Sequence, residues 1–230
     1  MQDTIALIVT SEKTWPKLQT FCLNQAFQAQ RARLDLAVVL NGKCEQAVEY
    51  LKTFSPEFLF TRPNYGLDPA GFDHLIKNIP LQYQYYYLLH DDHWFLDPEW
   101  FGQMRELAAA HPGVQVFGNL AKSTANYHPT YDSLSRILGY DGYNPDAIPF
   151  FVQGMAGLYR RTAMESLLEL DGIPHIHRNA MPVVWLCERL VTTLLFKAGM
   201  KFMQIPPGYE QYLKHNFHLT SAESAYVPRP

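Results

Sequence analysis

Residues 83–93 read Tyr83-Gln84-Tyr85-Tyr86-Tyr87-Leu88-Leu89-His90-Asp91-Asp92-His93, an aromatic and aliphatic run that continues directly into two adjacent acids. This composition is typical of a buried strand, so we expect a strand over residues 83–90. At least one of the two carboxylates should project beyond the end of that strand. Two adjacent acids repel each other unless a cation or a hydrogen-bond donor neutralises them, which makes a divalent metal their natural partner.

The rest of the chain alternates between strand-like and helix-like segments. Runs of β-branched and aliphatic residues predict buried strands over 5–10 and 34–40, with a helix over 15–33 between them. Further strands are expected over 57–61, 114–117, 150–160 and 201–205, and helices over 45–54, 69–79, 163–170, 183–198 and from Asp97 onward. The alternation predicts an α/β fold with a mostly parallel sheet, helices on both faces, and ligands bound beyond the carboxyl ends of the strands.

The length and composition of the chain fit one domain. The 230 residues are 47% hydrophobic, enough to bury one sizeable core, so we expect a single domain over 1–230. The net charge of -3 provides no basic field that would attract nucleic acid or an anionic membrane. Three dispersed cysteines without a CxxC spacing suggest neither a disulfide framework nor a zinc site.

Targeting signals are not evident in the sequence. The short apolar start lacks the basic residues and the long apolar stretch of a signal peptide, and no run approaches the roughly 20 apolar residues of a spanning helix. We therefore expect no transmembrane segment and a cytoplasmic protein that is either soluble or peripherally associated with a membrane.

Several short motifs, taken in order, resemble the family 2-type inverting glycosyltransferases, which have the GT-A fold. Residues 88–100 look like that family's strand with its acidic metal-binding motif, followed by a helix start that contains proline. Four more segments are similar in order and spacing: the first nucleotide-binding strand at 5–10, the Asn64-Tyr65-Gly66 turn, the glycine and basic pair at Gly154 and Arg160-Arg161, and Cys187-Glu188 upstream of Gly199. The resemblance covers most of the chain.

The resemblance implies a GT-A (Rossmann-like) nucleotide-diphospho-sugar transferase fold, in which residues 1–118 form the nucleotide-sugar-binding half and residues 119–230 form the acceptor-binding half and C-terminal tail. It implies a metal-dependent enzyme, using Mn²⁺ or Mg²⁺, that moves a sugar from a nucleotide-sugar to an acceptor hydroxyl with inversion. A UDP-sugar is the default donor. A glycan, a lipid-linked sugar, a protein and a modified nucleic-acid base all stay open as acceptors, as does the oligomeric state.

Individual roles carry over residue by residue. Asp92 aligns with the metal ligand, and Asp91 with a residue that helps to hold the metal or the donor ribose. Glu188 aligns with the catalytic base. The physics agrees, because a carboxylate on an apolar helix face is desolvated, which raises its pKa and makes it a better base. A salt bridge between Glu188 and Arg189, or a solvated position, is the structural alternative.

The expected donor site is broader than the two acids. Its candidate residues are Thr10, Glu12, Asn41, Asn64, Gly66, Asp68, Asp91 and Gly154. Leu40 stands where the family has an Asp near the nucleotide base, so Asn41, Glu12 or Asp68 would have to compensate. His215 and His218 are candidates for the metal or the diphosphate, since several GT-A enzymes contribute a late histidine, although such a residue is more often at the surface.

Two other classes of function fit parts of the sequence. A catalytically silent GT-A-like binding module is suggested by Leu40 and by Cys187, which replaces the first acid of the family's Glu-Asp pair. A metal-dependent phosphohydrolase is suggested by the run from His90 to His93. The polar, tyrosine-rich segment 119–149 is too long for an ordinary connection, and we expect it to be an acceptor-facing lid.

Overall fold

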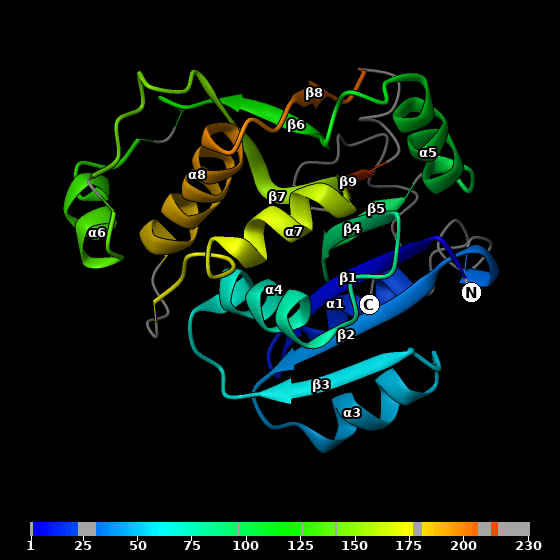
Figure 1. Ribbon diagram of the computed structural model, residues 1–230. Helices are drawn as coiled ribbons and strands as arrows, with labels where there is room; N and C mark the ends of the chain where they lie inside the picture. The colour runs from blue at the N-terminus through cyan, green and yellow to red at the C-terminus, as the bar shows by residue number, and fades with distance from the viewer. Residues whose placement is uncertain are drawn as a thin grey trace, which may run out of the picture.

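A seven-stranded sheet in the order β3-β2-β1-β4-β7-β6-β8 forms the centre of the molecule (Figure 1). The computed structural model describes residues 2–22, 31–95, 97–125, 127–140, 142–176, 181–206 and 213–215. The strands of this sheet are β1 (Thr4–Ser11), β2 (Asp35–Asn41), β3 (Phe58–Arg62), β4 (Tyr85–His90), β6 (Val116–Lys122), β7 (Phe150–Arg160) and β8 (Phe202–Gln204). Strands β3, β2, β1 and β4 run parallel, and β7 is antiparallel to both β4 and β6.

Helices cover both faces of the sheet. The helices are α1 (Trp15–Cys22), α3 (Glu45–Lys52), α4 (Leu67–Asn78), α5 (Trp100–Ala110), α6 (Tyr131–Ile137), α7 (Arg161–Glu169) and α8 (Met181–Lys197), with a 3₁₀ turn η1 (Arg31–Arg33). One core contains buried residues of α1, α3 and α5, and the other contains buried residues of α4, α7 and α8. In Figure 1, α4 and α7 lie in front of the sheet and α1 lies behind it.

Alternation along β1 explains the two cores. Ala6 and Ile8 pack on the face of α1, α3 and α5, whereas Leu7 and Val9 pack on the face of α4, α7 and α8. A strand with apolar residues at every position is buried on both faces, as the continuous run at 5–10 predicts. The predicted mostly parallel α/β fold with helices on both faces is therefore confirmed.

Some element boundaries differ from those predicted. Helix α5 begins at Trp100 with Glu99 as its N-cap residue, later than the predicted start at Asp97, and Asp97 lies just before the helix, where its Oδ1 accepts the backbone N–H of Glu99 at 2.7 Å. Helix α1 is described to Cys22, and the middle of the predicted 15–33 helix lies outside the described residues. The sequence also did not predict α6 or the antiparallel pair of β5 (His93–Phe95) and β9 (Leu213–His215).

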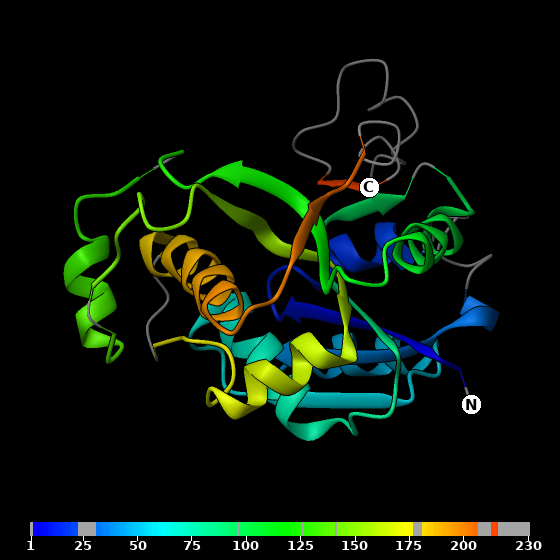
Figure 2. The ribbon, with the colours of Figure 1, turned by 45° about the horizontal axis from the view of Figure 1, so that its top comes forward.

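The segment 119–149 does not form the expected lid. Its first residues continue β6, and α6 then packs on α8, to one side of the sheet (Figure 2). Tyr131 and Tyr143 are buried in a small apolar cluster with Leu186 and Leu190 of α8. Their rings therefore stabilise the fold of this half, and none of the described residues of the segment lines the cavity described below.

Strand β7 bulges where it passes the carboxyl end of β4. The interval from Val152 to Gly157 on β7 faces the shorter interval from Gly118 to Leu120 on β6. The excess residues are accommodated by left-handed backbone at Gly154 (φ 63°) and Met155 (φ 56°). A bulge of this kind bends the strand and turns backbone groups out of the ladder, often beside a functional site.

Replacing Gly154 by Ala should destabilise the protein by roughly 1–2 kcal/mol, because a side chain in left-handed backbone costs about that much. The measurement is the free energy of unfolding in urea. Gly113→Ala is the matched control, since Gly113 is exposed and a Cβ there meets nothing within 4 Å. An equal effect in both variants would contradict the conformational argument.

Candidate active site

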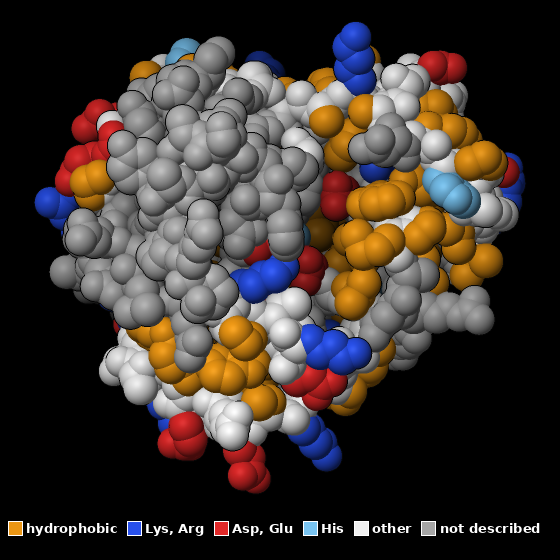
Figure 3. Space-filling model, turned by 180° about the vertical axis from the view of Figure 1, so that it is seen from behind, with side chains coloured by type: hydrophobic (Ala, Val, Ile, Leu, Met, Phe, Trp, Pro, Cys, Tyr) orange, Lys and Arg blue, Asp and Glu red, His pale blue; other side chains and the backbone are white. Residues whose placement is uncertain are grey.

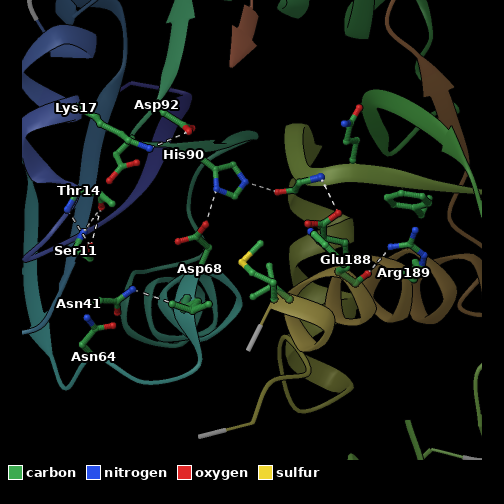
Figure 4. Close-up of a pocket in the computed structure, with 18 residues that line it drawn as sticks. Ser11, Thr14, Lys17, Asn41, Asn64, Asp68, His90, Asp92, Glu188 and Arg189 are labelled. Carbon is green, nitrogen blue, oxygen red and sulfur yellow. Dashed lines mark hydrogen bonds and ion pairs between the residues drawn. The ribbon is translucent and has the colours of Figure 1, made fainter. Parts of the chain in front are cut away.

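A cavity of about 420 Å³ opens at the carboxyl ends of β1, β2 and β4. One wall carries polar side chains of the parallel strands, α1 and α4, and the opposite wall consists of β7 and α8. Figure 3 shows a hollow in which acidic and basic side chains lie beside a largely apolar surface, and Figure 4 shows the labelled residues at close range. The cavity lies where an open parallel sheet binds ligands.

Asp91 is buried and held in place by a neighbouring strand. Its Oδ2 accepts a hydrogen bond of 2.8 Å from the hydroxyl of Thr10, the penultimate residue of β1. Burial raises the pKa of Asp91 to about 6, the hydroxyls of Thr14 and Thr10 oppose that rise, and the charges of Asp68 and Asp92 add to it. Thr10 thus acts on the cavity through Asp91.

Asp92 lies against a cation. Its Oδ2 is 3.5 Å from Nζ of Lys17, which belongs to α1, and its side chain retains 12% of its exposure. Lys17 is a cavity residue that the sequence patterns did not predict. Its position was nonetheless accessible from the sequence, since residues 11–17 directly follow the first buried strand, and Ser11 and Thr14 line the same cavity.

The two acids are the metal ligands that the sequence predicts. Within the described ranges, no three or more His, Cys, Asp or Glu side chains are arranged to hold a metal ion. Two adjacent carboxylates do fit Mg²⁺ or Mn²⁺, which commonly take one or two carboxylates plus phosphate oxygens of a substrate. His215 pairs with His93 through the β5–β9 backbone register, and the contacts of its side chain, like the whole of His218, lie outside the described residues.

The structure divides the predicted donor residues into two groups. Asn41, Asn64 and Asp68 line the cavity. Glu12 does not line it, and its carboxylate instead accepts the backbone N–H of Lys43 at 3.1 Å and the amide of Asn64 at 3.4 Å. Glu12 therefore contacts Asn64, which lines the cavity, without lining the cavity itself.

Gly66, a predicted donor residue, and Leu40, which stands where the family has an Asp, both have local structural roles. Gly66 is the left-handed N-cap of α4, with φ 72°, and sets the start of that helix. Leu40 is buried in the apolar core, so the alternation of β2 directs the next residue, Asn41, toward the cavity. The Oδ1 of Asn41 accepts a hydrogen bond of 2.5 Å from Arg62, and its Nδ2 donates to the carbonyl of Leu67 at 3.3 Å.

His90 joins the two walls of the cavity. Its Nδ1 lies 2.9 Å from Oδ2 of Asp68, and its Nε2 lies 2.5 Å from the carbonyl oxygen of Gly154. Both partners are acceptors, so both ring nitrogens carry protons and the ring is an imidazolium. Although burial opposes the charge, the hydrogen bond and charge of Asp68, the charge of Asp92 and the Gly154 carbonyl raise the pKa of His90 to about 10.

Glu188 occupies the opposite wall, on α8. Its Oε2 accepts the backbone N–H of Gly154 at 3.1 Å. Burial raises the pKa of Glu188 to about 7, against the effects of the Gly154 N–H, His90 and Arg189. The guanidinium of Arg189 donates instead to the carbonyls of Trp185 and Ala125, so the alternative of a Glu188–Arg189 salt bridge is not what the structure contains.

The wall formed by β7 and α8 is mainly apolar. Met181, Val184, Trp185 and Glu188 recur at helical spacing and all line the cavity. Phe151 of β7 lies on the same wall. A carboxylate that is a proton acceptor near neutral pH thus sits at the end of an apolar helix face, across the cavity from Asp91 and Asp92.

No protein-family model matches this sequence, and no curated protein matches it by sequence. Among solved structures, TarS residues 1–349 from S. aureus superposes with a TM-score of 0.59 at 11% identity, over 90% of this chain and 58% of that one. The same fragment in complex with UDP-GlcNAc gives a TM-score of 0.55 at 11% identity, over 90% of this chain and 56% of that one.

The mannosyltransferase PcManGT from Pyrobaculum calidifontis, solved with GDP-Man and Mn²⁺, gives a TM-score of 0.59 at 11% identity, over 89% of this chain and 55% of that one. This chain therefore spans a little over half the length of these structures. At such low identity the similarity establishes the fold alone. The fold is GT-A, shared with nucleotide-sugar transferases. Among the described residues, no helix combines the length and apolarity needed to cross a membrane.

Glu188→Gln should stabilise the protein at pH 8 and have little effect at pH 5. A carboxyl whose folded pKa of about 7 exceeds its unfolded value of 4.5 favours folding while protonated, and that contribution is lost as pH rises through 7. Removing the charge should gain on the order of 1–3 kcal/mol at pH 8. Urea unfolding at both pH values measures it. Glu165→Gln, on an exposed position of α7, is the control and should show no such pH-dependent gain; a gain shared by both variants would contradict the prediction.

Proposed function

We propose that this protein is a glycosyltransferase that transfers a sugar from a nucleotide-sugar to an acceptor hydroxyl. The observation that carries the proposal is the placement of Glu188, a buried carboxylate with a pKa near 7, across one cavity from Asp91 and Asp92 at the carboxyl end of β4. The GT-A fold and the neighbours that bind UDP-GlcNAc and GDP-Man support it. In this proposal, the wall that carries Asp91 and Asp92 binds the donor, and the wall that carries Glu188 binds the acceptor.

The donor side is suited to a nucleoside diphosphate. Ser11, Thr14 and Asn64 offer hydroxyl and amide groups at the ends of the parallel strands, where the nucleotide binds in this proposal. Lys17 offers a positive charge to the diphosphate. Asp92 and Asp91 would hold Mn²⁺ or Mg²⁺, which supplies positive charge to the leaving diphosphate. These assignments make residues 1–118 the donor half, and 119–230 the acceptor half.

The acceptor side carries the base. Glu188 accepts the proton of the acceptor hydroxyl while that oxygen attacks the anomeric carbon, and the bond from this carbon to the diphosphate oxygen breaks. Attack from the wall opposite the diphosphate is a single in-line displacement, so the sugar is transferred with inversion. A buried carboxylate whose pKa matches the working pH is efficient in this role.

The two alternatives draw less support from the geometry. A silent binding module would not need a buried base, and the substituted positions Leu40 and Cys187 both lie in packed interior, away from the cavity lining. A phosphohydrolase centred on His90 and His93 would need ring nitrogens for metal. The ring of His90 is bonded at both nitrogens, and Nδ1 of His93 accepts the backbone N–H of His90 at 2.9 Å.

The direct test is a thermal-shift screen of nucleotide-sugars with and without Mn²⁺, followed by assays of sugar transfer and donor hydrolysis. A ligand that binds only the folded state raises its stability by mass action. Binding without turnover would support the silent module, and phosphate release from simple esters would support the phosphohydrolase. The acceptor, which could be a glycan, lipid-linked sugar, protein or modified base, is then sought with the donor so identified.

We infer a cytoplasmic location, soluble or peripheral to a membrane, which fractionation would test.

Asp92→Asn should weaken metal-dependent donor binding at least tenfold, because an amide cannot replace the anionic ligand. The measurement is titration of the donor by calorimetry with and without Mn²⁺. Asp132→Asn, on the exposed surface of α6, serves as the control and should bind normally. If Asp92→Asn retains wild-type Mn²⁺ dependence, the metal assignment fails.

Glu188→Gln should leave donor affinity within a few-fold while transfer falls by a factor on the order of 10² to 10⁴, the usual contribution of a general base. The amide can still accept the Gly154 N–H, so the backbone should keep its position. Steady-state transfer and donor titration measure the two effects separately. Transfer within a few-fold of wild type would mean that Glu188 is structural.

A further inference from the structure

Three hydrogen bonds, joined through the backbone of Gly154, link the donor side of the cavity to Glu188. They run from Asp68 of α4 to His90 of β4 at 2.9 Å, from His90 to the Gly154 carbonyl of β7, and from the Gly154 N–H to Glu188 of α8 at 3.1 Å (Figure 4). They use both polar groups of one residue, Gly154. Anything that fixes the Gly154 backbone therefore also fixes the partner of the Glu188 carboxylate.

The Gly154 backbone lacks strand partners. The β4–β7 ladder ends at Leu88 and Gly157, and the β6–β7 ladder resumes only at Val152. Buried backbone groups outside a ladder need other partners. In the described part of the chain these are Glu188 for the N–H and His90 for the carbonyl, so the bulge depends on two side chains rather than on the sheet.

His90 is well suited to fix this bulge. Its ring is buried, packs edge-on against Phe72 with ring centroids 5.5 Å apart, and is bonded at both nitrogens. A hydrogen bond from a charged donor is roughly twice as strong as one between neutral groups. Asp68 fixes the ring's orientation from the other side, so the ring has one arrangement that satisfies both partners.

We infer that His90 is a positioning residue for the base: it fixes the Gly154 carbonyl and, through the Gly154 Cα, restricts the preceding peptide, whose N–H holds the Glu188 carboxylate in the cavity. The inference rests on the proposed function for Glu188 and assigns to His90 a role that the two neighbouring acids do not have. His90 acts through the backbone and is not itself a ligand of the reacting groups. Through His90, Asp68 on the donor side also affects the position of the Glu188 carboxylate.

The charge of His90 gives the inference a spectroscopic signature. The groups that act on the charge of Glu188 are His90 on β4, Arg189 on α8 and Asp68 on α4, together with the Gly154 N–H on β7. The Gly154 N–H, His90 and Arg189 favour the ionised carboxylate, and Asp68 opposes it. Loss of the imidazolium removes the contribution of His90. The pKa of Glu188 should then rise further above 7, and a larger fraction of the base should be protonated at neutral pH.

The first test is a double-mutant cycle of His90→Gln and Glu188→Gln. His90→Gln should lower kcat for transfer about tenfold or more and change the donor KM less than about threefold, since residues that act as a unit affect the same step. In the Glu188→Gln background, His90→Gln should lower kcat less than about twofold. Equal losses in both backgrounds would overturn the inference, because they would show that His90 contributes independently of the base.

The second test does not require activity. A ¹³C NMR titration of the Glu188 carboxyl should show its pKa raised by about one unit or more in His90→Gln, as expected when a nearby opposite charge is removed. His74→Gln, which alters a half-buried histidine further along α4, is the matched control and should leave the titration unchanged. An unchanged titration in His90→Gln overturns the inference.

Two remaining outcomes are distinguishable. If wild type shows no transfer with any donor but the Glu188 titration moves in His90→Gln, the proposed function fails while the link from His90 to Glu188 stands. If His90→Gln does not fold, Asp68→Asn replaces it, because Asp68 is partly exposed, at 41% of its side chain, and its loss removes the partner that orients the ring. That variant should lower kcat in wild type and much less in the Glu188→Gln background; equal losses would overturn the inference.

Discussion

The charged ring of His90, held between the carboxylate of Asp68 and the carbonyl of Gly154, is the contact on which the cavity depends. His90, the last residue of β4, and the two acids that follow it are three consecutive ionisable residues, and burial of an unpaired charge is costly. Each of the three therefore has a partner from another element: Asp68 and Gly154 for His90, Thr10 for Asp91, and Lys17 for Asp92. These partners draw β1, α1, α4 and β7 together around the end of one strand.

The sequence predicts the framework of this arrangement because the framework follows from local patterns. Apolar runs indicate the parallel strands, and strand ends in such a sheet meet at one edge, so the place of Asp91 and Asp92 follows directly. The place of Glu188 follows from the apolar helix around it. Both inferences use only the residues of one strand or helix, together with the general rule that parallel strands end at the same edge of a sheet.

The partners themselves depend on pairings between distant parts of the chain. The bulge at Gly154 arises because β7 has more residues than β6 between two ladder pairs, and no local pattern reports the number of residues on the opposite strand. The Lys17–Asp92 and His90–Gly154 contacts require that register to be known. The prediction of a lid over 119–149 was wrong for a related reason. The polar composition of this segment does not show that Tyr131 and Tyr143 are buried against α8.

The two acids at the end of β4 differ in how firmly their carboxylates are held. Asp91 is buried and accepts a hydroxyl hydrogen bond, so its carboxylate has a fixed orientation. Asp92 pairs at 3.5 Å with Lys17, a partly exposed cation on a flexible stem. The Lys17 side chain is 34% exposed and that of Asp92 12%, so the cation of this pair has more contact with solvent than the anion. In the proposed function, the same pair places a cation beside the diphosphate and an anion beside the metal, at one side of the cavity.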